Sequence, residues 1–318
     1  MHIFITGGTG LIGTALVKTL IRQGHDVMVL SRNPLKAEKK LEKQAKFCTS
    51  LQAMKSLDGY DAVINLAGEP IIGKRWTKKQ KERLCNSRWN ITRRLTELIK
   101  ASDRPPKVFI SGSAIGYYGA QDNNNILTEK SGFNDEFTHQ LCKKWEELAL
   151  AAQSDKTRVC ISRTGVVLSK EGGMLAILTL PFRLGLGCTL GKGSQYISWI
   201  HIQDMVNAII YLMDMPEAQG IFNLTAPNPV TNKRFSNILS ATLYRPRIFR
   251  MPAFIMKLVM SEAATMVVDG QRAIPQHLSD LHYRFIFEHL DEALSALLKG
   301  RKYKKQLVGS GSQKGING

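Results

Sequence analysis

Long apolar runs are absent from this 318-residue sequence, and no stretch approaches the roughly 18 apolar residues of a membrane-spanning helix. The first residues, Met1–Ile5, lack a basic leader and a cleavage site, so we expect no signal peptide. Cysteine is scarce too. The five cysteines are scattered without C-x-x-C spacing, which argues against a disulfide framework and against a metal site. These absences predict a cytoplasmic protein that does not bind a membrane.

Acidic residues are also few, with 26 Asp and Glu against 44 Lys and Arg, so the formal net charge is +18. The last residues, 299–318, hold six basic side chains and no acidic one, yet the chain stays basic without them. A basic surface can attract nucleic acid or a small anion. Because no nucleic-acid-binding motif is present, we do not expect nucleic acid as a partner, and a small anionic substrate is the better expectation.

Apolar segments of strand length alternate with segments of helical periodicity over the first 225 residues. The strand-like segments are 2–6, 25–30, 62–66, 108–111, 159–163 and 220–224, and the helical ones are 11–24, 77–100, 136–153 and 203–214. This alternation predicts an α/β fold with a doubly wound parallel sheet of the Rossmann type.

A second region begins near residue 226, where prolines separate short helical segments. We predict a Rossmann domain over 1–225, in which 168–198 contributes to a substrate lobe, and a small C-terminal lobe over 226–298. Residues 299–318 are rich in Lys, Gly and Ser and are predicted to form a disordered basic tail.

The first predicted strand ends in a glycine-rich turn. Gly8-Thr9-Gly10-Leu11-Ile12-Gly13 fits G-x-G-x-x-G, and Gly7, Gly10 and Gly13 also fit G-x-x-G-x-x-G. Glycines in such a turn permit a tight bend and let the backbone approach a pyrophosphate, while the N-terminus of the following helix presents N–H groups. The position between a strand and a helix favours a dinucleotide site over a turn with packing duties alone.

The end of the second predicted strand, Leu30-Ser31-Arg32-Asn33, bears on the choice of cofactor. An acidic residue there binds the 2′-hydroxyl of NAD, whereas an arginine accommodates the 2′-phosphate of NADP. No carboxylate is present, and Arg32, next to Ser31, can form charge-assisted hydrogen bonds to a phosphate. NADP(H) is therefore favoured over NAD(H), unless Arg32 is a solvated surface residue.

Several phrases of the sequence, taken together and in order, resemble one family. They are TGGTGLIG (6–13), VINLAGEPI (63–71), SGSAIGYYG (111–119), RTGVVL (163–168), WIHIQDM (199–205) and GIFNL (220–224), with KRWT…SRWNIT (74–92) and GQRAIP (270–275) narrowing the match. The chain is identified as a YfcH-type member of the NAD(P)-dependent epimerase/dehydratase family, within the extended short-chain dehydrogenase/reductases. The resemblance implies a catalytic Ser113, dimers in many members, and cofactor contacts at Leu66, Ala67, Gly68, Glu69 and Val166.

The sequence departs from this resemblance at the catalytic pair Tyr-x-x-x-Lys, in which the lysine lowers the pKa of the tyrosine. Aligned on Glu146, the corresponding helix carries Thr138 in place of the tyrosine and Cys142 in place of the lysine. Tyr117 is a candidate substitute for the missing phenol, although Tyr118 and its neighbours also resemble a structural turn.

His139 and Lys143 form a second candidate pair, because i, i+4 spacing places them on one helix face. The plainer expectations are a surface position for His139 and a core position for Cys142.

Arg88 lies on the apolar stripe of the helix at 77–100, between Leu84 and Ile91. A charge there is costly unless it is paired, so Arg88 should either meet a buried carboxylate or face an anion in the cleft. Arg75, just before this helix, is placed to reach a phosphate. His201 is a further candidate ligand, although a packing role is the first expectation for it.

Two functions follow from these observations. The first is an NADP(H)-dependent oxidoreductase, or a nucleotide-sugar-type epimerase-like enzyme, that acts at a secondary alcohol or ketone. The second is a non-catalytic NADP(H)-binding redox sensor or partner-binding protein, which the loss of Tyr-x-x-x-Lys favours.

Overall fold

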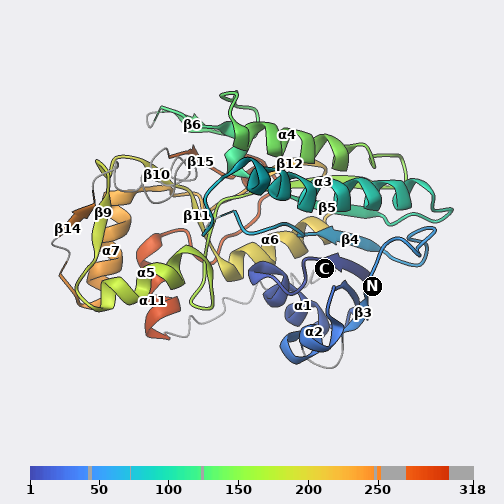
Figure 1. The fold of residues 1–318 in the computed structure, drawn as a ribbon, viewed down its shortest axis with the longest axis horizontal. Coiled ribbons are helices and arrows are strands. Elements are labelled where there is room, and N and C mark those ends of the chain that lie inside the picture. Colours follow the sequence, from blue (N-terminus) through green and yellow to red (C-terminus); the bar gives the residue numbers. More distant parts are fainter. Residues whose placement is uncertain (42–44, 72, 123–124, 247–248, 252–269, 301–318) are drawn as a thin grey trace, which may run out of the picture.

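A computed structural model describes residues 1–41, 45–71, 73–122, 125–246, 249–251 and 270–300. Its centre is a parallel sheet with the strand order β3-β2-β1-β4-β5-β7-β12 (Figure 1). These strands are β1 (His2–Thr6), β2 (Asp26–Leu30), β3 (Lys46–Cys48), β4 (Ala62–Asn65), β5 (Val108–Ala114), β7 (Arg158–Thr164) and β12 (Gly220–Leu224). The predicted doubly wound sheet is confirmed, because the chain runs outward from β1 on one side and returns to add β4 on the other.

Helices cover both faces of the sheet (Figure 1). α1 (Leu11–Arg22), α2 (Pro34–Leu41) and α6 (Ile202–Asp214) pack on one face, and α3 (Lys78–Lys100) and α4 (Phe137–Leu150) pack on the other. The strands are apolar on both sides, as a parallel sheet between two helical layers requires. In β1, Ile3 and Ile5 join the core under α1 and α6, whereas Phe4 joins the core under α3 and α4.

Two elements beside β2 were not predicted from the sequence. α2 is mostly polar and buries only Ala37 and Leu41, so its apolar periodicity is weak. It begins at Pro34, and the side chain of Asn33 accepts a hydrogen bond from the backbone N–H of Lys36 at 3.1 Å. β3 is three residues long and gives no alternation that could be recognised. Tertiary pairing with β2 therefore decides this edge of the sheet.

Most of the shorter elements form a lobe at one end of the sheet (Figure 1). The shorter elements are η1 (Ile115–Tyr118), β6 (Ile126–Leu127), β8 (Val166–Leu168), α5 (Gly173–Arg183), β9 (Cys188–Leu190), β10 (Tyr196–Ile197), β11 (Trp199–His201), β13 (Val230–Thr231), α7 (Asn232–Leu243), β14 (Phe249–Met251), β15 (Arg272–Ala273), α10 (Gln276–Asp280) and α11 (Leu290–Lys299). Of these, η1 packs on α4, and α10 packs on the edge strand β12. A separate apolar cluster joins α5, α7 and α11 around Trp199. Mid-chain and C-terminal segments thus share one core, although the domain boundaries at 225 and 298 stay predictions.

The predicted basic tail lies outside the described residues from 301 onward. Among the helices that the structure describes, none is long and apolar enough to cross a membrane.

Candidate functional site

The glycine-rich turn lies at the carboxyl end of β1, directly beside the carboxyl end of β4. Gly7 has a φ of 70°, and a Cβ there would stand 2.4 Å from the carbonyl oxygen of Leu66. A Cβ on Gly13 would stand 2.2 Å from the carbonyl oxygen of Gly7. Gly8 is buried, and its Cβ would stand 2.7 Å from the side chain of Val29. At these three positions the packing of the protein itself therefore requires glycine.

Gly10 differs from the other three glycines because it is exposed and a Cβ would meet only the carbonyl oxygen of Gly7, at 3.2 Å. Gly10 is the N-cap of α1 and offers no side-chain acceptor, and the first turn of α1 contains no acidic residue. The N–H groups of Leu11 and Ile12 in that turn are thus left available to an anion. The residues present fit the pyrophosphate of a dinucleotide.

Basic side chains flank this turn on the side of β2. Arg32 is exposed, and none of the described residues pairs with its guanidinium; Ser31 precedes it at the end of the strand. Lys40 of α2 donates from Nζ to the carbonyl oxygen of Thr9 in the turn itself, at 2.7 Å. Positive charge therefore gathers where the sequence predicts the cofactor's ribose phosphate.

Asn65, the last residue of β4, anchors the start of the segment that follows this strand, residues 66–69, by hydrogen bonds to two neighbouring elements. This buried side chain accepts from the hydroxyl of Thr6 in β1 at 2.6 Å and donates to the hydroxyl of Thr92 in α3 at 2.8 Å. The next residues, Leu66 and Ala67, come out of the sheet against the glycine turn. The turn and this segment therefore meet at the point where strand order reverses, which is where open α/β sheets bind ligands.

Glu69 is held by two consecutive residues of α3. Its N–H donates to Oγ of Ser87 at 2.9 Å, and its carbonyl oxygen accepts from Nη2 of Arg88 at 2.9 Å. The carboxylate of Glu69 pairs with Lys74 at 2.6 Å, and this hydrogen bond lowers the pKa of Glu69. Arg75, which follows Lys74 in the sequence, is exposed. No carboxylate among the described residues pairs with Arg88, so the buried ion pair expected as one of its two environments is not found.

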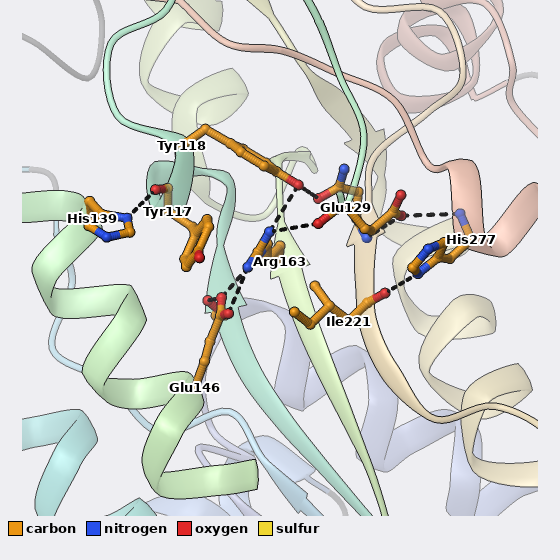
Figure 2. Close-up of polar contacts among 10 residues, drawn as sticks. Tyr117, Tyr118, Glu129, His139, Glu146, Arg163, Ile221 and His277 are labelled. Atoms are coloured by element: carbon orange, nitrogen blue, oxygen red, sulfur yellow. Dashed lines mark hydrogen bonds and ion pairs between the residues drawn. The ribbon is translucent and has the colours of Figure 1, made fainter. Parts of the chain in front are cut away.

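Ser113, Glu146 and Arg163 form a buried polar group at the carboxyl ends of β5 and β7. The hydroxyl of Ser113 donates to Oε1 of Glu146 at 2.6 Å. Arg163 donates two hydrogen bonds to the same carboxylate, from Nε at 2.9 Å and from Nη2 at 2.8 Å (Figure 2). The three residues are at most 5% exposed. The proton of Ser113 is therefore committed to Glu146, while its oxygen keeps lone pairs to accept another hydrogen bond.

Tyr117 and Tyr118 are edge-to-face neighbours that both lie near Arg163, but they differ in their surroundings (Figure 2). The ring centroid of Tyr117 is 3.4 Å from Cζ of Arg163, and no described residue hydrogen-bonds its hydroxyl. Tyr118 is fully buried and donates to Asn223 at 2.7 Å, and burial raises its pKa to about 12. Tyr118 is thus a structural residue, and Tyr117 is the phenol with an unused hydroxyl.

The expectation that His139 lies on the helix surface is wrong. The side chain is 1% exposed, stacks on Phe133 with ring centroids 3.7 Å apart, and donates from Nδ1 to the carbonyl oxygen of Tyr117 at 2.7 Å (Figure 2). η1 and the loop that precedes α4, which contains Phe133, cover the first turn of α4. The periodicity of the helix does not reveal this cover. Lys143 is exposed, and its Nζ lies 6.0 Å from the centroid of the same Phe133 ring, so one residue of the pair is buried and the other faces solvent.

Cys142 occupies the core, as the sequence predicts. It is 2% exposed within an apolar cluster that includes Leu141 and Trp145, and burial raises its pKa to about 12. Thr138 is buried as well. Neither side chain can replace the missing tyrosine and lysine.

Val166 and His201 lie on paired strands at the edge of the lobe, β8 and β11. The imidazole of His201 caps α6, because Nδ1 accepts the N–H of Gln203 at 3.0 Å. Burial lowers its pKa to about 4, so at neutral pH His201 is uncharged and brings no positive charge to an anion. Contacts of Val166 and His201 with a ligand stay predictions.

Sequence reasoning missed the pairing of Glu146 with Arg163, although a signal was present. Arg163 is the next-to-last residue of β7, a strand with an apolar centre, and Glu146 directly follows Trp145 on the buried side of α4. Two opposite charges on buried faces of neighbouring elements indicate an ion pair. Within the described ranges, no three His, Cys, Asp or Glu side chains gather as metal ligands.

A parallel sheet with a glycine turn at its switch point defines a dinucleotide-binding α/β protein. Residues 3–225 match the family model described as the NAD dependent epimerase/dehydratase family, and residues 251–297 match a domain of unknown function, DUF1731. The first match spans well over half of the chain. The protein belongs to the NAD-dependent epimerase/dehydratase family, as the resemblance of its motifs indicates.

Relatives support this assignment over nearly the full length. The chain is 35% identical to the epimerase family protein YfhF of Bacillus subtilis over 303 residues, which cover 95% of this chain and 99% of the relative. It is 36% identical to the chloroplastic SDR39U1 homolog of Arabidopsis thaliana, covering 94% and 87%. The crystal structure of the human epimerase family protein SDR39U1 with NADPH is 32% identical, with a TM-score of 0.87 over 95% of this chain and 100% of that one.

Proposed function

We propose that this protein is an NADP(H)-binding oxidoreductase, or a nucleotide-sugar-type epimerase-like enzyme, that acts at a secondary alcohol or ketone of a small anionic substrate. The observation that carries the proposal is the uncapped N-terminus of α1 at the glycine turn, beside the end of β4. NADP(H) is favoured because Arg32 is exposed without a partner among the described residues and because Lys40 touches the turn. The human relative with NADPH supports the same choice.

Ser113 and Tyr117 are the residues proposed to handle the substrate oxygen. A bound nicotinamide would accept or donate the hydride at the carbon. Since the proton of Ser113 points to Glu146, Ser113 can accept a hydrogen bond from a substrate hydroxyl. Tyr117 can donate one, because its own hydroxyl has no partner among the described residues. The pair would orient a secondary alcohol, and in its oxidation the substrate proton would pass to Ser113 while Ser113 passes its own proton to Glu146.

A second candidate function is a non-catalytic NADP(H) sensor. The burial of Thr138 and Cys142 supports it, because the positions of the usual tyrosine and lysine hold side chains that transfer no proton at neutral pH. The five cysteines are all free, which fits the reducing cytoplasm proposed for either function.

Calorimetry with NADP, NADPH, NAD and NADH tests the cofactor proposal. We expect NADPH to bind more tightly than NADH, and Arg32→Ala to weaken NADPH by at least about tenfold without affecting NADH, because a charged hydrogen bond contributes about 1.5–3 kcal/mol. Arg22→Ala, an exposed arginine at the end of α1, is the matched control. Equal losses for NADPH and NADH in Arg32→Ala would refute the 2′-phosphate role.

Oxidation of NADPH by a panel of carbonyl compounds separates the enzyme from the sensor. Turnover that disappears in Ser113→Ala and Tyr117→Phe, while both variants still bind NADPH, supports the enzyme. Tight NADPH binding without turnover of any compound in the panel supports the sensor.

A further inference from the structure

Arg88 is a buried positive charge without an acidic partner among the described residues. It is 9% exposed, and its guanidinium donates to three neutral oxygens of the described residues: the carbonyls of Leu84 at 3.0 Å and Glu69 at 2.9 Å, and Oγ of Ser87 at 3.3 Å. A guanidinium has five N–H donors, so part of its capacity is unused. Burying such a charge is costly unless a negative group or a polar ligand compensates it.

The guanidinium of Arg88 lies against Gly68, in the segment after β4 that borders the proposed cofactor site. A Cβ on Gly68 would stand 2.9 Å from Cζ of Arg88, so glycine is needed there for the charge to come this close. On the other side, Cζ is 5.2 Å from the ring centroid of Trp145 in α4. Nε1 of that indole is buried and has no hydrogen-bond partner among the described residues. The guanidinium of Arg88 and the indole Nε1 of Trp145, both with unused donor capacity, thus lie close together between α3 and α4.

Cys142, which stands where the family's lysine is expected, lies near this guanidinium. Burial lowers the pKa of Arg88 and raises that of Cys142 to about 12, so the thiol beside the positive charge is neutral. The two helices pack together here, since Leu84 and Cys85 of α3 share an apolar cluster with Cys142 and Trp145. The space beside position 142 therefore holds a positive charge, delivered from the neighbouring helix.

We propose that Arg88 supplies from α3 the positive charge that a lysine at position 142 would supply from α4, and that this charge contributes to holding the bound nicotinamide cofactor. The inference rests on the proposed cofactor binding and adds a residue to it. The family phrase SRWNIT, which contains Arg88, then serves the cofactor site as well as the packing of α3. The competing explanation is a brace, in which Arg88 merely ties Glu69 to α3.

Moving the charge back to α4 distinguishes the two explanations. The variants are Arg88→Met, Arg88→Lys, Cys142→Lys and the double variant Arg88→Met with Cys142→Lys. Arg93→Met, an exposed arginine of the same helix, is the control. The measurements are the NADPH dissociation constant by calorimetry and the thermal unfolding midpoint without nucleotide.

We expect Arg88→Met to weaken NADPH by about tenfold or more, the equivalent of at least one charged hydrogen bond. The double variant should recover most of that loss, because Met vacates the space into which the lysine introduced by Cys142→Lys would extend. The single ammonium of a lysine lacks the planar fork with which Arg88 binds the carbonyls of Glu69 and Leu84 together, so we expect that a brace would not be rescued. A double variant that folds and binds as weakly as Arg88→Met would overturn the proposal.

Arg88→Lys keeps the proposal testable if Arg88→Met does not fold. A charge role predicts that this variant holds NADPH within about threefold while its unfolding midpoint falls, because the fork is lost. A parallel fall of both would support the brace instead. Wild-type protein that fails to bind NADPH would refute the proposed function itself, whereas normal NADPH binding by Arg88→Met would refute only the role of Arg88.

Discussion

Gly13→Ala and Gly10→Ala should separate the two reasons for glycine in the turn. The new Cβ of Gly13→Ala would stand 2.2 Å from the carbonyl oxygen of Gly7, whereas ordinary contact begins at 3.4 Å. The backbone must therefore shift by about 1 Å, and such overpacking costs about 3 kcal/mol in the free energy of unfolding. The better helix propensity of alanine returns about 1 kcal/mol, so we expect a net loss of about 2 kcal/mol.

Gly10→Ala should cause a much weaker steric clash than Gly13→Ala. Its Cβ would stand 3.2 Å from the carbonyl oxygen of Gly7, and the N-cap φ of −72° suits alanine. We expect a loss of about 0.5 kcal/mol, since alanine is a poorer N-cap than glycine. NADPH affinity should nevertheless fall by about tenfold or more, because the methyl group projects where a pyrophosphate approaches α1.

Urea unfolding of the nucleotide-free protein and calorimetry with NADPH measure the two effects on the same preparations. The reasoning predicts opposite patterns: Gly13→Ala loses mainly stability, and Gly10→Ala loses mainly affinity. A Gly10→Ala protein that binds NADPH as tightly as wild type would refute the assignment of the α1 N-terminus to the cofactor. A stability loss equal in both variants would refute the steric account.

Two further predictions concern buried titratable groups. The folded pKa of His201, about 4, lies below its ordinary 6.5, so its contribution to stability is complete above pH 6.5 and is lost as pH falls toward 4. The loss amounts to roughly 3 kcal/mol; urea unfolding from pH 7 to pH 4 should show it, and His201→Asn, which keeps an N-cap acceptor, should flatten it. Glu146→Gln should cost about 3 kcal/mol in urea unfolding, because it leaves the charge of Arg163 buried without its partner. Glu147→Gln, which breaks only the exposed pair with Lys144, is the control and should change stability by less than about 0.5 kcal/mol.

The central sheet and the glycine turn could be predicted from the sequence because both depend on local patterns. Short apolar segments separated by helical periodicity permit little besides a parallel sheet with crossover helices. The turn requires glycine at Gly7 and Gly13 because the backbone itself passes within contact distance, and a motif of fixed spacing reports that directly. α2 and β3 escaped prediction because they bury too few residues to show a period.

The candidate site beyond the turn was decided by tertiary structure. The spacing of His139 in its helix predicts a surface position, but Phe133, in the loop before the helix, covers its side chain. The helical pattern does not include that loop. Whether Arg88 met a carboxylate depended on which side chains the packing of α3 against α4 would bring near, and these proved to be Trp145 and Cys142.

The same reason explains Ser113, which the sequence marked as reactive without showing where its proton would point. Its partner Glu146 lies 33 residues away on a different element, and Arg163 comes from a third. Sequence determined which segments form strands and helices, since these choices are made within a few residues. Only the fold decided which buried charges meet, because that depends on distances between elements that no local pattern contains.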